Sequence, residues 1–126
     1  LAVFFEQGNC HACDVLHTEP LEDPEVLEQL KHFDAVQLDM WSDAPVITPG
    51  GVRTNARDWA NQLGLFFAPT LVFFDESGQE VFRVESVVQM YRLSRVLSYV
   101  QQKGYLTSPD YQRWHGIRPV KDSLRE

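Results

Sequence analysis

The amino-acid sequence predicts a single α/β domain built on a mixed β-sheet. Its 126 residues allow one domain with one core, and a hydrophobic content of 44% is enough to fill that core. Strand-like apolar segments alternate with helix-like segments in the first part of the chain, which is typical of α/β folds. Two later strand-like segments are separated by a short turn and predict an antiparallel hairpin.

The chain opens on a continuous apolar segment, residues 1–5, which predicts a buried strand. This strand ends at a turn in which Gly8 and Asn9 provide the turn and capping residues. A short helix is predicted from Cys10 onward, because apolar residues follow at helical spacing.

A second helix and a second strand follow this first unit. Asp23 and Pro24 have the form of an N-cap and a first helical position, so a helix is predicted over residues 24–32. Residues 34–41 then predict a strand. A connection of this length between two strands indicates parallel pairing with a right-handed crossover.

Residues 42–53 form a long segment rich in proline and glycine after the second strand. Because the carboxyl ends of parallel strands share one edge of a sheet, we expect this segment to leave the sheet beside Cys10. A long loop at such an edge is either a binding element or a surface insertion, and the sequence leaves both open.

The second half of the chain predicts a helix, a hairpin and a last helix. The first helix spans residues 55–63, the hairpin strands span 70–74 and 80–84, and the last helix runs from Val88 to Gly104. The expected domain covers residues 1–106, and residues 107–126 form a C-terminal extension. In this extension we expect a short helix near Ser108, packing by Tyr111 and Trp114, and loose chain beyond Gly116.

Charge and hydropathy exclude several classes of partner. The formal net charge of −7 opposes binding to nucleic acid. No apolar run reaches the roughly 20 residues that span a bilayer, so membrane insertion is not expected. We expect a monomer. The sequence opens at Leu1 without an initiator Met or a charged leader segment, so we expect a mature or trimmed chain. Export is then compatible with the sequence, and a cytoplasmic location stays open.

Two cysteines, Cys10 and Cys13, carry the predicted chemistry. A thiol in the first turn of a helix lies near unpaired N–H groups and the positive end of the helix dipole, which favour the thiolate. Cys10 is therefore the predicted nucleophile. Cys13 lies three residues further on the same face, close enough for a disulfide, and is the predicted resolving thiol. This pair predicts thiol–disulfide exchange with a protein or small-molecule disulfide, with no cofactor besides the redox-active disulfide.

These features resemble the thioredoxin-like proteins. The resemblance consists of the cysteine pair after the first apolar strand and of Ala68, Pro69 and Thr70 before the hairpin, with the elements in the same order. It implies a three-layer fold, with a mixed central sheet and helices on both faces. It further implies that Pro69 is cis and lies against the cysteines, and that the backbone of Ala68 binds the substrate. The residues expected to support the two cysteines are Glu6, His11, Ala12, Ala68, Pro69 and Thr70.

A narrower resemblance is to the SoxW-type periplasmic thioredoxins associated with bacterial sulfur oxidation. Residues 4–7, 36–41, 69–78 and 80–83 carry it. It implies a periplasmic or otherwise exported protein that reduces partner disulfides and is itself reduced by a membrane thiol–disulfide donor. Trp41, at the end of the second strand, is a candidate substrate-binding residue together with Ala68.

The sequence departs from the common thioredoxin pattern at the residues that move the proton of the resolving thiol. The family pattern has a buried Asp and a Lys there, and Phe4 and Gln37 occupy these places here. Another group must therefore accept the proton, and Glu6 and Asp14 are the candidates.

Metal binding is the alternative that these residues leave open. Cys10, Cys13 and His17 offer two thiolates and an imidazole, a set suited to zinc or copper. A Cys-x-x-Cys pair between strand and helix nevertheless favours redox chemistry, so no metal is predicted. The histidines His17, His32 and His115 are each interpreted as surface residues.

Overall fold

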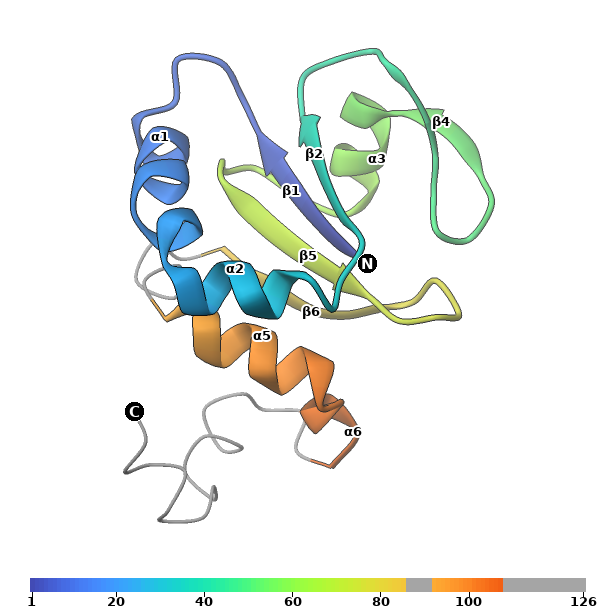
Figure 1. Cartoon of the computed structure of the whole chain (residues 1–126). Coiled ribbons are helices and arrows are strands. Elements are labelled where there is room, and N and C mark those ends of the chain that lie inside the picture. The colour runs from blue at the N-terminus through green and yellow to red at the C-terminus, as the bar shows by residue number, and fades with distance from the viewer. Residues whose placement is uncertain (86–91, 108–126) are drawn as a thin grey trace.

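The computed structural model describes residues 1–85 and 92–107, which form a three-layer α/β fold (Figure 1). Within these residues a mixed four-stranded sheet lies between helices on both faces. None of the helices in these two ranges is long and apolar enough to cross a lipid bilayer. The strands are β1 (Ala2–Glu6), β2 (Ala35–Asp39), β3 (Pro45–Ile47), β4 (Arg53–Asn55), β5 (Thr70–Phe74) and β6 (Glu80–Val84). The helices are α1 (His11–Thr18), the short 3-10 helix η1 (Pro20–Glu22), α2 (Pro24–Leu30), α3 (Ala56–Gln62), α5 (Leu93–Gln101) and α6 (Gly104–Thr107).

The main sheet has the strand order β2-β1-β5-β6. Strand β1 pairs in parallel with β2, and it pairs antiparallel with β5 on its other side. Strand β6 returns antiparallel beside β5. The predicted parallel pair, the predicted hairpin and the mixed α/β class are therefore confirmed.

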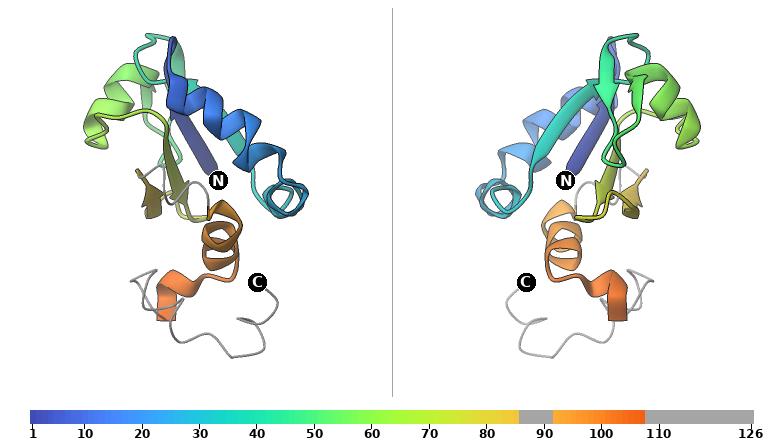
Figure 2. Two further views of the ribbon diagram at one scale, coloured as in Figure 1. Left: turned by 90° about the vertical axis from the view of Figure 1, so that its left-hand side faces the viewer. Right: turned by 90° about the vertical axis from the view of Figure 1, so that its right-hand side faces the viewer.

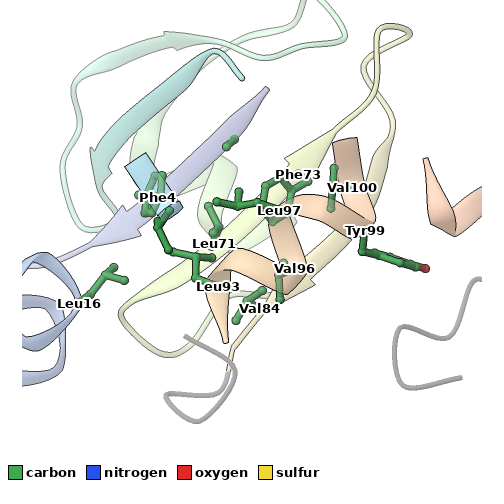
Figure 3. Packing of buried hydrophobic residues seen from close by; sticks show 12 residues of the cluster. Phe4, Leu16, Leu71, Phe73, Val84, Leu93, Val96, Leu97, Tyr99 and Val100 are labelled. Carbon is green, nitrogen blue, oxygen red and sulfur yellow. The ribbon is translucent and has the colours of Figure 1, made fainter. Parts of the chain in front are cut away.

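The two faces of the sheet bury different residues, because successive side chains of a strand point to opposite faces. On one face, Ala2 and Phe4 of β1 pack with residues of α1, α2 and α5 (Figure 3). On the other face, Val3 and Phe5 pack with Trp59 of α3. Figure 2 shows the sheet between α3 on one side and α1 with α2 on the other. Glu6 continues the alternation of β1 and lies on the face of Phe4 and α1.

Several helix boundaries differ from the sequence prediction. Helix α2 begins at Pro24 after the Asp23 cap as predicted, but it ends at Leu30. The last helix does not extend to Gly104, because α5 ends at Gln101 and Lys103 turns the chain with a φ of 55°. Gly104 instead begins α6. The predicted start at Val88 and all expectations for residues 108–126 lie outside the described residues.

Residues 45–55, called the insertion below, form a small antiparallel hairpin that the sequence did not predict. Its strands, β3 and β4, pair with each other and not with the main sheet. The segment 42–53 begins near the cysteine loop, where Trp41 Nε1 donates a hydrogen bond to Gln7 Oε1 at 2.6 Å. Its tip, however, lies against the β5–β6 turn, at the end of β5 opposite the cysteines (Figure 1). Most of this insertion therefore lies away from the cysteine pair.

Gly78 is the residue that makes this contact between the β5–β6 turn and the tip of the insertion. Its φ is +89°, and a Cβ at this position would lie 2.7 Å from the Pro49 carbonyl oxygen. We expect Gly78→Ala to destabilise the fold by more than about 1–2 kcal/mol, because the left-handed backbone is strained and the insertion must also move. Urea unfolding measures this difference as a lower midpoint.

Gly64→Ala is the matched control for Gly78→Ala. Gly64 has a similar φ of +73°, but nothing lies within 4 Å of its added Cβ. It therefore reports the backbone strain alone, and its loss of stability is expected to be smaller. Equal losses in the two variants would contradict the close packing of the tip of the insertion on the turn.

Candidate active site

The cysteine pair lies at the junction between β1 and α1. Strand β1 ends at Glu6, and Asn9 turns the chain with a φ of 52° directly before Cys10. Cys10 itself is the N-cap of α1, so the expectation that Gly8 and Asn9 cap this helix is wrong. The reason is that the Cys10 sulfur accepts a hydrogen bond from the Cys13 N–H, as the side-chain oxygen of an Asn cap would do. Cys10 and Cys13 form a disulfide, with their Cα atoms 5.2 Å apart.

The sulfur of Cys10 is surrounded by hydrogen-bonding backbone groups. Cys10 Sγ accepts a hydrogen bond from the Cys13 N–H at 3.0 Å, and it lies 3.7 Å from the Ala68 carbonyl oxygen. A backbone N–H at a helix N-terminus stabilises a negatively charged sulfur, which is the form of the thiol that attacks disulfides. Both residues are buried, with 7% of Cys10 and 4% of Cys13 exposed, so a partner disulfide must approach closely to reach Cys10.

The segment 68–70 lies against the cysteine pair where the two central strands β1 and β5 end and begin. The peptide bond between Ala68 and Pro69 is cis, and Pro69 is buried. Thr70 begins β5, and its hydroxyl donates a hydrogen bond to the Phe67 carbonyl oxygen at 2.7 Å. Ala68 is half-buried and meets Cys10 through its carbonyl oxygen. The structure thus brings the two separate sequence motifs together.

Three exposed aromatic side chains lie on the segment that follows β2 and on the segment that precedes Ala68. Trp41 is 56% exposed, and Phe66 and Phe67, directly before Ala68, are 75% and 68% exposed. A cavity of about 430 Å³ between β2 and α3 is lined by residues that include Trp41 and Phe66. Trp41 is among the substrate-binding residues predicted from the sequence, but the two phenylalanines are not. The signal that could have found them is an apolar pair directly before Ala68–Pro69, outside any predicted strand or helix.

Glu6 and His17 form a pair beside Cys13 that the sequence analysis did not predict. The Glu6 side chain is 8% exposed, and His17 Nε2 lies 2.8 Å from each of its carboxyl oxygens. His17 is 42% exposed, so its interpretation as a simple surface residue is incomplete. Glu6, Cys13 and His17 line one cavity of about 410 Å³ between β1, α1 and β2.

The other predicted site residues take more peripheral places. His11 is exposed in the first turn of α1, and Ala12 is half-buried beside it. Asp14 is exposed on α1 and lines the cavity of Glu6. Phe4 is part of the hydrophobic core, and Gln37 lies on exposed β2 with its Nε2 atom 3.5 Å from His17 Nε2.

The set Cys10, Cys13 and His17 does not form a metal site in this structure. Both sulfurs are joined in the disulfide, and His17 Nε2 contacts Glu6. Across residues 1–85 and 92–107, no three His, Cys, Asp or Glu side chains are arranged to hold a metal ion.

Comparisons with known proteins agree with this fold. A profile of the thioredoxin-like domain matches residues 1–101. Among solved structures, a thioredoxin-fold protein from Helicobacter pylori superposes with a TM-score of 0.73 at 15% identity, covering 91% of this chain and 76% of that one. No curated protein matches the sequence. With a Cys-x-x-Cys pair at disulfide distance in this fold, the site supports thiol–disulfide oxidoreductase chemistry in general. The chain belongs to the thioredoxin-like domain family.

Proposed function

We propose that this protein reduces disulfides of partner proteins, with Cys10 as the attacking thiol and Cys13 as the resolving thiol. In the first step the Cys10 thiolate attacks a partner disulfide, and one partner sulfur leaves as a thiolate. In the second step Cys13 loses its proton and attacks Cys10 Sγ. The second partner sulfur then leaves with the bonding electrons. The partner gains two electrons, and the cysteine pair is oxidised to the disulfide.

The observation that carries this proposal is the position of Cys10 as the N-cap of α1. Its sulfur accepts the N–H of Cys13 and also faces the Ala68 carbonyl oxygen. The N–H favours the reactive thiolate. The Ala68 backbone is at the right place to hold an extended partner segment against the sulfur, as the family resemblance implies.

The exposed aromatic residues around the site support a protein as the substrate. Phe66 and Phe67 directly precede Ala68, and Trp41 lines one cavity with Phe66, so these side chains offer exposed apolar contacts to a partner chain. Large exposed apolar side chains in one region often mark a binding surface for proteins. We assign the substrate-binding role to Trp41 and Ala68, with the two phenylalanines added.

A periplasmic location and a reducing role complete the proposal. They are supported by the resemblance of residues 4–7, 36–41 and 69–78 to SoxW-type periplasmic thioredoxins linked to sulfur oxidation. In this role a membrane thiol–disulfide donor returns two electrons to the Cys10–Cys13 disulfide after each turnover.

The equilibrium of the cysteine pair with glutathione tests the reducing role. We expect a reduction potential near the reducing end of the thioredoxin range, about −270 mV, read by thiol alkylation and mass spectrometry at neutral pH. A potential near about −120 mV would identify an oxidant instead. A pair that never forms the disulfide, or a protein purified with one bound metal per chain, would favour the metal-binding alternative.

A further inference from the structure

We infer that Glu6 and His17 act together as the proton acceptor for Cys13 when this thiol resolves the mixed disulfide. The inference rests on the proposed exchange function of the cysteine pair. It gives the buried Glu6 carboxyl group and the His17 side chain one joint role in proton transfer. Their contact is seen only in the structure.

The burial of Glu6 is the first observation. Its side chain is 8% exposed at the end of β1, where the preceding residues of the strand are all apolar. Burying an ionisable group is costly unless a partner satisfies it. His17 is that partner, because its Nε2 atom lies 2.8 Å from both carboxyl oxygens.

The contact between Glu6 and His17 requires a shared proton. A carboxylate oxygen and an imidazole nitrogen at 2.8 Å are both acceptors unless one of them carries hydrogen. Either Nε2–H donates to the carboxylate, or a carboxylic acid donates to Nε2. In the first form Nδ1 of the neutral imidazole is free and can take up one further proton. In the second form Nδ1 carries hydrogen, and the pair already holds that proton.

The position of the pair relative to Cys13 is the second observation. Cys13 and His17 are four residues apart on α1, so their side chains lie on the same face of the helix. Together with Glu6 they line the cavity of about 410 Å³. This space is large and polar enough to hold water molecules, which can carry a proton between groups that do not touch.

The remaining titratable groups at this cavity are less suited to the role. Asp14 of α1 and Asp39 at the end of β2 also line it, but both are exposed to solvent, which screens their charges. Asp39 Oδ1 already accepts a hydrogen bond from the Trp41 N–H at 2.9 Å. His11 is exposed at the start of α1 and is not part of the cavity lining.

The resolving step can now be written with its proton. In the mixed disulfide, Cys10 Sγ is bonded to a partner sulfur and Cys13 is a thiol. As Cys13 Sγ attacks Cys10 Sγ, its proton passes to the Glu6–His17 pair, and the partner sulfur leaves with the electron pair of the broken bond. The departing thiolate takes a proton from solvent. The pair returns its extra proton to solvent through the exposed side of His17.

Release of thionitrobenzoate from Cys10 measures this step alone. Reduced protein reacts with dithiobis-nitrobenzoate at Cys10, and attack by Cys13 then releases the second coloured thiolate. This leaving group needs no proton at neutral pH, so the pH dependence of its release reports the proton loss of Cys13. Stopped-flow absorbance separates this release from the first reaction at Cys10.

Glu6→Gln is the variant that tests the inference. We expect its release rate at neutral pH to fall by about 100-fold, the low end of what a positioned acid or base contributes. We also expect a steeper pH profile, rising by about tenfold per pH unit through the neutral range, because only the ionised fraction of Cys13 then attacks. The first reaction at Cys10 should change far less, because the Cys13 N–H that favours the Cys10 thiolate remains in place.

Asp39→Asn is the matched control. It removes one negative charge from the same cavity but leaves the Glu6–His17 pair intact, so the wild-type pH profile is expected. Equal slowing in Asp39→Asn and Glu6→Gln would overturn the inference, because the effect would then belong to the charge and not to the pair.

The outcomes also separate the inference from the proposed function. An unchanged pH profile in folded Glu6→Gln overturns the inference while the exchange function stands. If Glu6→Gln does not fold, His17→Gln decides in the same way, since His17 is partly exposed and its loss leaves the core unchanged. A wild-type protein whose Cys13 releases no second thiolate overturns both the exchange function and the inference.

Discussion

Cys10→Ser is expected to reduce disulfide exchange to the uncatalysed background, whereas Cys13→Ser is expected to keep the first step and lose turnover. The serine hydroxyl at position 10 cannot attack a disulfide, although it can still cap α1 by accepting the Cys13 N–H. In Cys13→Ser the mixed disulfide forms but has no internal thiol to resolve it. Turnover is measured as the reduction of insulin disulfides by the protein in the presence of dithiothreitol.

Both serine variants should remain folded, which makes each a control for the other. The disulfide closes a loop of very few residues, so its loss changes the entropy of the unfolded chain only slightly. Similar thermal midpoints for the two reduced variants and the reduced wild type are expected. Substantial insulin reduction by Cys10→Ser would contradict the assignment of Cys10 as the attacking thiol.

Phe4→Asp is expected to destabilise the fold strongly. This substitution places the family's usual acidic residue into the sequence, but Phe4 is 6% exposed and packs in the core beneath α1 and α5 (Figure 3). Loss of the ring alone costs about 3–5 kcal/mol. The carboxyl group adds to this cost because it is buried without a partner. Stabilities of about 5–15 kcal/mol are typical of natural domains, so much of the folded population should be lost.

Phe4→Leu is the control for this variant, since it keeps an apolar side chain at the same place. It should lower the urea midpoint much less than Phe4→Asp does. A Phe4→Asp protein with the midpoint of the wild type would show that this part of the core accepts a carboxyl group.

The main elements of the fold could be predicted from the sequence because their signals are local. Strands β1 and β5 are short apolar runs that end at turn residues, and they were placed within one residue. Helix α2 begins where the Asp23–Pro24 pair predicts it, and the Asp23 side chain accepts the Glu25 N–H. A capping side chain and the N–H group that it binds are close in sequence, so a short stretch of sequence includes both partners of this hydrogen bond.

The insertion was not predicted because its strands carry almost no pattern. Strands β3 and β4 have three residues each and none of these residues is buried, so no alternation of apolar residues marks them. The place of the tip beside Gly78 depends on a backbone contact between distant segments. Neither feature has a signal within a short window of sequence.

The candidate site also has a part that local sequence motifs predict and a part that depends on contacts between distant residues. The cysteine pair and the Ala68–Pro69 motif are short motifs, and the family resemblance linked them before the structure showed Cys10 against the Ala68 carbonyl oxygen. The Glu6–His17 pair joins residues 11 positions apart and depends on how α1 packs over the end of β1. Sequence alone offered Glu6 and Asp14 as equal candidates, and only burial and pairing distinguish them.

Formation of the mixed disulfide is the measurement that tests the central claim most directly. Reduced Cys13→Ser and reduced Cys10→Ser are each mixed with insulin, quenched with acid and analysed by mass spectrometry of the intact proteins and their peptides. We predict a covalent complex through Cys10 in Cys13→Ser and no comparable complex in Cys10→Ser. The absence of a complex in folded Cys13→Ser, or its equally rapid formation through Cys13 in Cys10→Ser, would contradict the exchange mechanism.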